Sequence, residues 1–126
     1  MKRTLFFILT VLLVLTGCGG TDMEKTYQQI TQEEAKRIMD TQEVIILDVR
    51  EQDEFDAGHI PGAVLLPVGT ISAETAAVVI PELDSMVLVY CRSGNRSKTA
   101  SAALVELGYT NIYEFGGIST WPYEVE

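Results

Sequence analysis

The stretch that decides the fold spans residues 86–97 and reads Met86-Val87-Leu88-Val89-Tyr90-Cys91-Arg92-Ser93-Gly94-Asn95-Arg96-Ser97. Its first five residues are continuously apolar, which is typical of a strand buried on both faces of a parallel sheet. A polar turn containing a glycine follows, and residues 97–107 then predict a helix closed by Gly108. A strand, a tight loop and a helix in this order form the repeating unit of α/β sheets.

Similar signals lie on both sides of this unit. Apolar runs at residues 44–47, 62–66 and 111–115 predict three further strands. Helices are expected from Thr31 to about residue 40, over residues 51–57, and between Ser72 and Pro81, because capping and helix-ending residues bound these segments. Strands that alternate with helices predict an α/β domain with a mostly parallel sheet and helices on both sides.

The loop after residue 90 carries the residues that predict chemistry. Ligands of open α/β sheets bind beyond the carboxyl ends of the strands, and Cys91 stands at such an end. Backbone N–H groups and the start of a helix favour the thiolate form of a cysteine placed there. We therefore predict that Cys91 is a nucleophile beside a pocket for a small anion, although a buried structural cysteine is the alternative. The residues expected to bind the anion are Arg92, Ser93, Gly94, Asn95 and Arg96.

Other polar residues invite more modest interpretations. Asp48 and Arg50 end the neighbouring strand on the same side of the sheet, so they either support the Cys91 loop or form an ordinary buried ion pair. His59 is the only histidine, and we expect it to organise its turn by hydrogen bonds. The acidic residues between positions 51 and 56 are typical of a solvated helix face, so no metal site is expected, and Trp121 is expected in the core.

Length and composition limit the remaining possibilities. The chain has 126 residues, of which 47% are hydrophobic and only 2 are cysteines. These values fit one globular domain and exclude a miniprotein stabilised by disulfides. The formal net charge is −9, and a surface this acidic repels nucleic acid, so no nucleic-acid partner is expected.

The first 20 residues are typical of a targeting segment. Two basic residues precede an apolar run at residues 5–15, which is too short for a membrane span because a spanning helix needs about 20 residues. The sequence Leu15-Thr16-Gly17-Cys18 resembles the processing box of bacterial lipoproteins. We therefore expect cleavage of a signal peptide, residues 1–17, and a lipid anchor on Cys18.

This processing would define the domain organisation. Residues 18–25 would be the lipidated cysteine and a tether, and residues 26–126 would fold as the domain, held at a membrane outside the cytoplasm. Because Lys2 and Arg3 leave with the signal peptide, the net charge would change from −9 to −11. A lipid, rather than a basic surface, would then hold the protein at the membrane.

Residues 91–96 resemble the active-site loop of the single-domain rhodanese-like sulfurtransferases. Two further segments resemble that family in the same order along the chain: Asp48-Val49-Arg50 with Phe55 and Gly58-His59-Ile60-Pro61-Gly62-Ala63, and Gly116-Gly117-Ile118 through to Trp121. The likeness runs from about residue 27 to residue 121. It implies the three-layer rhodanese fold, with a mostly parallel sheet of about five strands flanked by helices.

The resemblance implies a persulfide mechanism. Cys91 would take the outer sulfur of a donor such as thiosulfate and pass it to cyanide or to a thiol, free or on a protein. Arg92 or Arg96 would contact the donor anion, and no metal or organic cofactor would be needed. In the two-domain members of the family an arginine that helps to hold thiosulfate occupies the place of Glu54, so efficient use of thiosulfate is in doubt.

Two alternatives differ in chemistry. Cysteine phosphatases and arsenate reductases of related fold have five residues between cysteine and arginine, whereas four separate Cys91 from Arg96 here. Arsenate reduction also expects a resolving thiol, but Cys91 is the only free thiol once Cys18 is lipidated. A non-catalytic rhodanese-like sulfur carrier or binding module is the second alternative, and such modules usually lack the cysteine.

Overall fold

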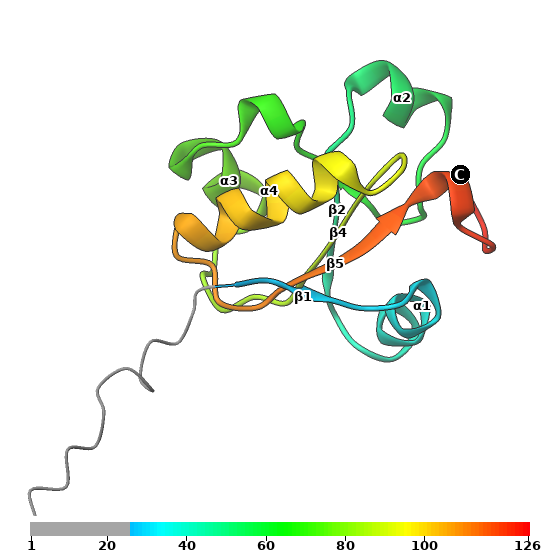
Figure 1. The fold of residues 1–126 in the computed structure, drawn as a ribbon, viewed down its shortest axis with the longest axis horizontal. Coiled ribbons are helices and arrows are strands. Elements are labelled where there is room, and N and C mark those ends of the chain that lie inside the picture. The colour runs from blue at the N-terminus through cyan, green and yellow to red at the C-terminus, as the bar shows by residue number, and fades with distance from the viewer. Residues whose placement is uncertain (1–25) are drawn as a thin grey trace, which may run out of the picture.

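The computed structural model describes residues 26–126, which form a five-stranded sheet with helices on both faces (Figure 1). All strand pairs are parallel, in the order β1-β5-β4-β2-β3. The strands are β1 (Gln28–Gln29), β2 (Ile45–Asp48), β3 (Val64–Leu65), β4 (Val87–Cys91) and β5 (Ile112–Gly117). The helices are α1 (Gln32–Thr41), α2 (Gln52–Ala57), α3 (Ala73–Val79), α4 (Asn95–Glu106) and the short 3-10 turns η2 (Val68–Thr70) and η3 (Ile118–Thr120).

The predicted α/β class, parallel sheet and flanking helices are confirmed. The helix α1 begins behind Thr31, whose side chain accepts a hydrogen bond from the Glu34 N–H at 3.0 Å. Strand β1 was not predicted, because its two residues are exposed glutamines with no apolar pattern. Helix α4 begins at Asn95, two residues before the predicted start, because Gly94 turns the chain with a φ of 103°.

The expected signal peptide, lipidated Cys18 and tether lie in residues 1–25, outside the described residues. Within residues 26–126, no helix is both long and apolar enough to cross a bilayer.

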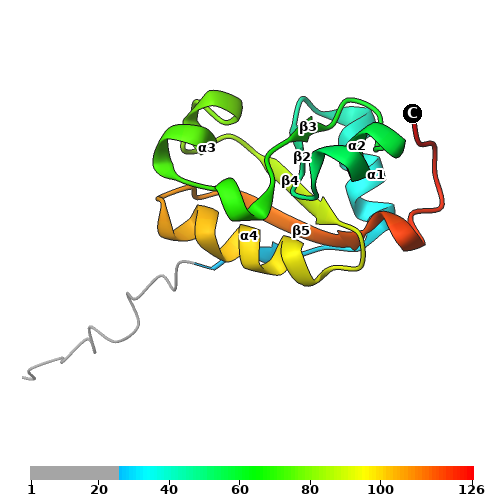
Figure 2. The same ribbon diagram turned by 90° about the horizontal axis from the view of Figure 1, so that it is seen from above.

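Alternate residues of the central strands build two separate cores. Val87, Val89 and Cys91 of β4 point to the face covered by α3 and α4. Leu88 and Tyr90 point to the opposite face, where they pack with residues of α1 and with the predicted core residue Trp121. Figure 2 shows α4 and α1 on opposite sides of the sheet. Burial on both faces explains the continuous apolar run of β4.

One irregularity in the sheet shapes the site. Val89 of β4 lies beside Glu114 of β5, but Cys91, two residues further, lies beside Gly117, three residues further. Strand β5 therefore contains one extra residue, a β-bulge, and Gly116 within it has a φ of 91°. The bulge brings a glycine next to the end of β4.

Candidate active site

Cys91 is the last residue of β4, and its side chain is buried with 1% exposure. The chain turns at Gly94 and enters α4, so the loop of residues 91–96 curls around the sulfur. The Gly94 N–H donates a hydrogen bond to Cys91 Sγ at 3.0 Å, and Ser97 Oγ lies 3.4 Å from the same atom. The sulfur thus lies at the N-terminus of a 12-residue helix, among N–H groups that favour negative charge.

Opposing effects act on the ionisation of this thiol. Burial by itself raises the pKa of Cys91, because a charged sulfur loses its solvation. Hydrogen bonds from the Ser97 hydroxyl and from the N–H groups of Ser97, Gly94 and Ser93 outweigh burial, so the pKa lies below the ordinary cysteine value. The site therefore favours a reactive thiolate.

The two glycines of the C-terminal motif fit closely against the loop. A Cβ on Gly117 would lie 1.9 Å from the carbonyl oxygen of Arg92, and a Cβ on Gly94 would lie 3.6 Å from the Cα of Gly116. The Ser119 N–H also donates to that Arg92 oxygen at 3.1 Å. Gly117 is required here because the loop backbone occupies the space of a side chain.

The predicted anion-binding residues differ in exposure and in ion pairing. Arg92, Ser93 and Asn95 are exposed at the surface of the loop, so they are accessible to a ligand. Arg96, in contrast, forms a bidentate ion pair with Glu54 of α2, with N–O distances of 2.6 and 2.9 Å. The prediction treated Arg96 as a contact for the donor and did not include this pairing, which joins residues 42 positions apart.

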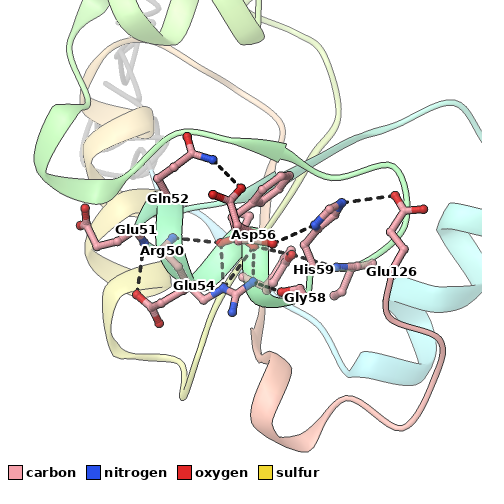
Figure 3. A network of polar contacts seen from close by, with 12 residues as sticks. Arg50, Glu51, Gln52, Glu54, Asp56, Gly58, His59 and Glu126 are labelled. Carbon is pink, nitrogen blue, oxygen red and sulfur yellow. Dashed lines mark hydrogen bonds and ion pairs between the residues drawn. The ribbon is translucent and has the colours of Figure 1, made fainter.

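The ion pair shifts the pKa of both partners. Hydrogen bonding to Arg96 lowers the pKa of Glu54 to about 2, and hydrogen bonding to Glu54 raises the pKa of Arg96. Glu54 also accepts a hydrogen bond from the Glu51 N–H at 3.2 Å, which fixes the carboxylate at the start of α2 (Figure 3). Any anion that binds the Arg96 guanidinium must therefore compete with Glu54.

Asp48 and Arg50 form a buried ion pair, one of the two predicted arrangements. Both guanidinium nitrogens Nε and Nη2 of Arg50 donate to the Asp48 carboxylate, the shortest contact being 2.7 Å. Arg50 Nη2 also donates to the carbonyl of Gly58 at 2.7 Å (Figure 3). The Tyr90 hydroxyl donates to Asp48 at 2.6 Å and accepts from the Ile60 N–H at 3.1 Å. The network lies on the α1 face and holds the turn after α2.

His59 has the structural role that the sequence predicted. Its ring stacks on Phe55 with centroids 3.8 Å apart, and Nδ1 lies 3.0 Å from the Phe55 carbonyl oxygen. Nε2 lies 3.3 Å from the carboxylate of Glu126 (Figure 3). The backbones of His59 and Glu126 also form two hydrogen bonds with each other. His59 therefore ties the turn after α2 to the C-terminal segment.

Two buried polar residues, Ser97 next to Cys91 and Glu114 behind Ser97, were not predicted from the sequence. Ser97 and Glu114 are buried on the α4 face, with 0% and 3% exposure. Ser97 Oγ donates to Glu114 Oε2 at 2.6 Å. The sequence feature that could have indicated a buried role for Glu114 is its position as an acidic residue within an otherwise apolar strand. In the described part of the chain, no cluster of three or more histidine, cysteine, aspartate or glutamate side chains is arranged to hold a metal ion.

A parallel α/β domain whose central strand ends in a thiol of lowered pKa, ringed by N–H donors, has the architecture of a cysteine-dependent group-transfer enzyme. Comparison with known proteins specifies the class. The rhodanese-like domain family matches residues 31–123. A putative mitochondrial thiosulfate sulfurtransferase of Schizosaccharomyces pombe is 39% identical over 106 residues, which cover 76% of this chain and 71% of that protein.

Further relatives agree. A thiosulfate sulfurtransferase of Coxiella burnetii is 32% identical over 96 residues, which cover 75% of this chain and 87% of that protein. A solved structure described as rhodanese with anions from E. coli is 28% identical, has a TM-score of 0.62, and matches 67% of this chain and 98% of its own. The chain therefore belongs to the rhodanese family and is a rhodanese-type sulfurtransferase.

Proposed function

We propose that this protein moves a sulfane sulfur from a small anionic donor, such as thiosulfate, to cyanide or a thiol through a persulfide on Cys91. The observation that carries the proposal is the Gly94 N–H, which donates to the Cys91 sulfur at 3.0 Å in a loop that lowers the pKa of that thiol. Such a loop stabilises negative charge both on the attacking thiolate and on the sulfur that it acquires.

The reaction has two steps in this proposal. The Cys91 thiolate attacks the outer sulfur of the donor, a new sulfur–sulfur bond forms, and the bond to the rest of the donor breaks. With thiosulfate, sulfite leaves with the bonding electron pair. In the second step the acceptor attacks the terminal sulfur of the persulfide, and Cys91 leaves as a thiolate.

The surroundings of the loop support a restricted choice of donor. Arg92 is exposed and forms no ion pair among the described residues, so within the loop of residues 91–96 it is the arginine available to an incoming anion. Arg96 is neutralised by Glu54. Thiosulfate is therefore proposed to be a usable but inefficient donor.

The decisive experiment mixes the purified protein with thiosulfate and measures sulfite release, followed by thiocyanate formation after cyanide is added. A mass gain of one sulfur on Cys91 identifies the intermediate. Cys91→Ser should abolish both products and leave thermal unfolding close to that of wild type. Turnover of a phosphate ester without any sulfur on Cys91 would favour a phosphatase instead.

We also propose that the protein is a lipoprotein anchored outside the cytoplasm through Cys18, with residues 1–17 removed. The support is the sequence Leu15-Thr16-Gly17-Cys18 after a short apolar run. Cells fed radioactive palmitate should label the wild-type protein and not the Cys18→Ser variant. Equal absence of label from both would refute the anchor. With Cys18 lipidated, an external acceptor must discharge the persulfide on Cys91.

A further inference from the structure

The ion pair between Glu54 and Arg96 lies on the accessible side of the Cys91 loop. The side chains of Glu54 and Arg96 are 24% and 34% exposed, so a molecule that approaches the loop can contact either of them. Arg96 is also close enough to the sulfur for Cys91 to raise the pKa of its guanidinium by charge attraction. The charge of this pair therefore acts on whatever reacts with Cys91.

Glu54 keeps its charge and its position. Its pKa of about 2 leaves the carboxylate ionised throughout the neutral range. The Glu51 N–H donates to it at 3.2 Å (Figure 3), and its two oxygens accept from Arg96 at 2.6 and 2.9 Å. A bidentate pair of this kind occupies two N–H donors that the guanidinium would otherwise offer to a ligand. Glu54 thereby cancels one positive charge of the loop.

The remaining cations suit a donor with one negative charge. Arg92 and Lys98 are exposed, and neither forms an ion pair within residues 26–126, so both can attract an anionic group. A second negative charge on the donor has no free Arg96 to bind. It meets the Glu54 carboxylate and the Cys91 thiolate, which both repel it.

We propose that Glu54 is the specificity-determining residue of this site and selects a donor with one negative charge, of the thiosulfonate class R–SO₂–S⁻, over dianionic thiosulfate. The Cys91 thiolate attacks the outer sulfur of the thiosulfonate and forms a sulfur–sulfur bond. The bond between the two sulfurs of the donor breaks, and its electron pair leaves with the sulfinate R–SO₂⁻. Cys91 becomes a persulfide anion, so atoms and charge are conserved.

The charge of the donor makes the role of Glu54 measurable. Coulomb energy is proportional to charge, so Glu54→Gln changes the interaction energy of a bound dianion twice as much as that of a monoanion in the same place. The gain in kcat/KM for thiosulfate should therefore be the square of the gain for methanethiosulfonate. At this partly exposed and screened site, we expect gains of about tenfold and about threefold. Each donor is compared with itself, so the different reactivities of the two donors cancel.

This inference rests on the proposed function, because Glu54 is argued to act on the donor of that reaction. The full protein is assayed with each donor, and thiocyanate formed from cyanide is measured and corrected for the background seen with Cys91→Ser. Glu54→Gln is compared with Asp53→Asn. Asp53 is an exposed carboxylate of the same helix that forms no ion pair in the described residues. Its replacement should change kcat/KM for either donor by less than about twofold.

Two outcomes would overturn selection by charge. Equal gains for both donors in Glu54→Gln would show that Glu54 acts on the shape of the loop, and unchanged values would show that its charge does not reach the donor. If Glu54→Gln fails to fold, wild-type kinetics at rising KCl concentration decide. Because Glu54 cancels Arg96, kcat/KM for thiosulfate should not fall as salt screens the site, and a steep fall would refute the selection.

Protection of Cys91 from iodoacetamide separates this inference from the proposed function, because no sulfur is transferred. Sulfate and methanesulfonate replace the dianionic and the monoanionic donor, and Glu54→Gln should strengthen protection by sulfate by the square of its effect on methanesulfonate. That result without any thiocyanate would refute the proposed function alone. Thiocyanate formation with equal gains for both donors would refute the selection alone. If neither ion protects Cys91 and no thiocyanate forms, both fail.

Discussion

Gly117→Ala should separate the activity of the protein from its fold. Gly117 has extended dihedral angles, φ −139° and ψ 156°, which alanine adopts without strain, so the effect must come from the added methyl group alone. That carbon would lie 1.9 Å from the Arg92 oxygen and 2.6 Å from the Ser93 nitrogen. Because Cβ contacts under 3.0 Å are essentially never seen, the loop must move by about 1 Å.

The expected loss follows from that displacement. A shift of about 1 Å in a catalytic group can reduce the rate about 100-fold, which corresponds to about 2.7 kcal/mol in the activation free energy. Overpacking of this kind also lowers the free energy of unfolding by about 1–3 kcal/mol. The variant should therefore remain folded at 25 °C while kcat/KM for sulfite release falls about 100-fold.

The assay compares Gly117→Ala with Gly69→Ala, measuring sulfite release together with urea unfolding. Gly69 has nothing within 4 Å of its Cβ position, so its replacement should leave kcat/KM unchanged. Wild-type activity in Gly117→Ala would show that the loop does not need its position against β5. A variant that unfolds completely would contradict the calculated magnitude.

Two further changes test the networks on either side of α2. Glu54→Gln should lower the KM for thiosulfate, because it releases Arg96 from its ion pair. The same change tests stability: since the pKa of Glu54 is lowered to about 2, the ion pair stabilises the folded protein above about pH 4.5, and this stabilisation is lost as the pH falls towards 2. The difference in Tm between wild type and this variant should shrink over that range, and a constant difference would contradict the ion pair as its source. Tyr90→Phe leaves the buried Ile60 N–H without its acceptor, so urea unfolding should show a loss of about 1–3 kcal/mol, whereas Tyr113→Phe, which removes no such bond, should change little.

Much of the fold could be predicted from the sequence because its strands are buried on both faces. The continuous apolar runs ending at Leu47 and Tyr90 identified β2 and β4 as buried strands, and Gly94 after the second run indicated the tight turn into α4. Strand β1 could not be predicted, since two exposed glutamines owe their extended form to pairing with β5 and not to any pattern of their own.

The site could be predicted only where its residues are neighbours in the chain. Cys91 and the N–H groups around it belong to one loop, so spacing alone placed them. The pairing of Arg96 with Glu54 joins a loop to a helix 42 positions away, and charge alone did not indicate that these two meet. Glu114 reaches the loop because β5 lies beside β4 in the sheet, which is a property of topology and not of local sequence.

The central position of β4 has a consequence for how such an enzyme can change. Glu54, on the side of β2, contacts Arg96 in the loop after β4, and Glu114, on the side of β5, contacts Ser97. These two glutamates share no hydrogen bond in the described structure. If sulfur transfer proceeds as proposed, selection for a different sulfur donor would replace the first without disturbing the second. Donor preference and thiol chemistry would then evolve as separate traits, on opposite flanks of a single strand.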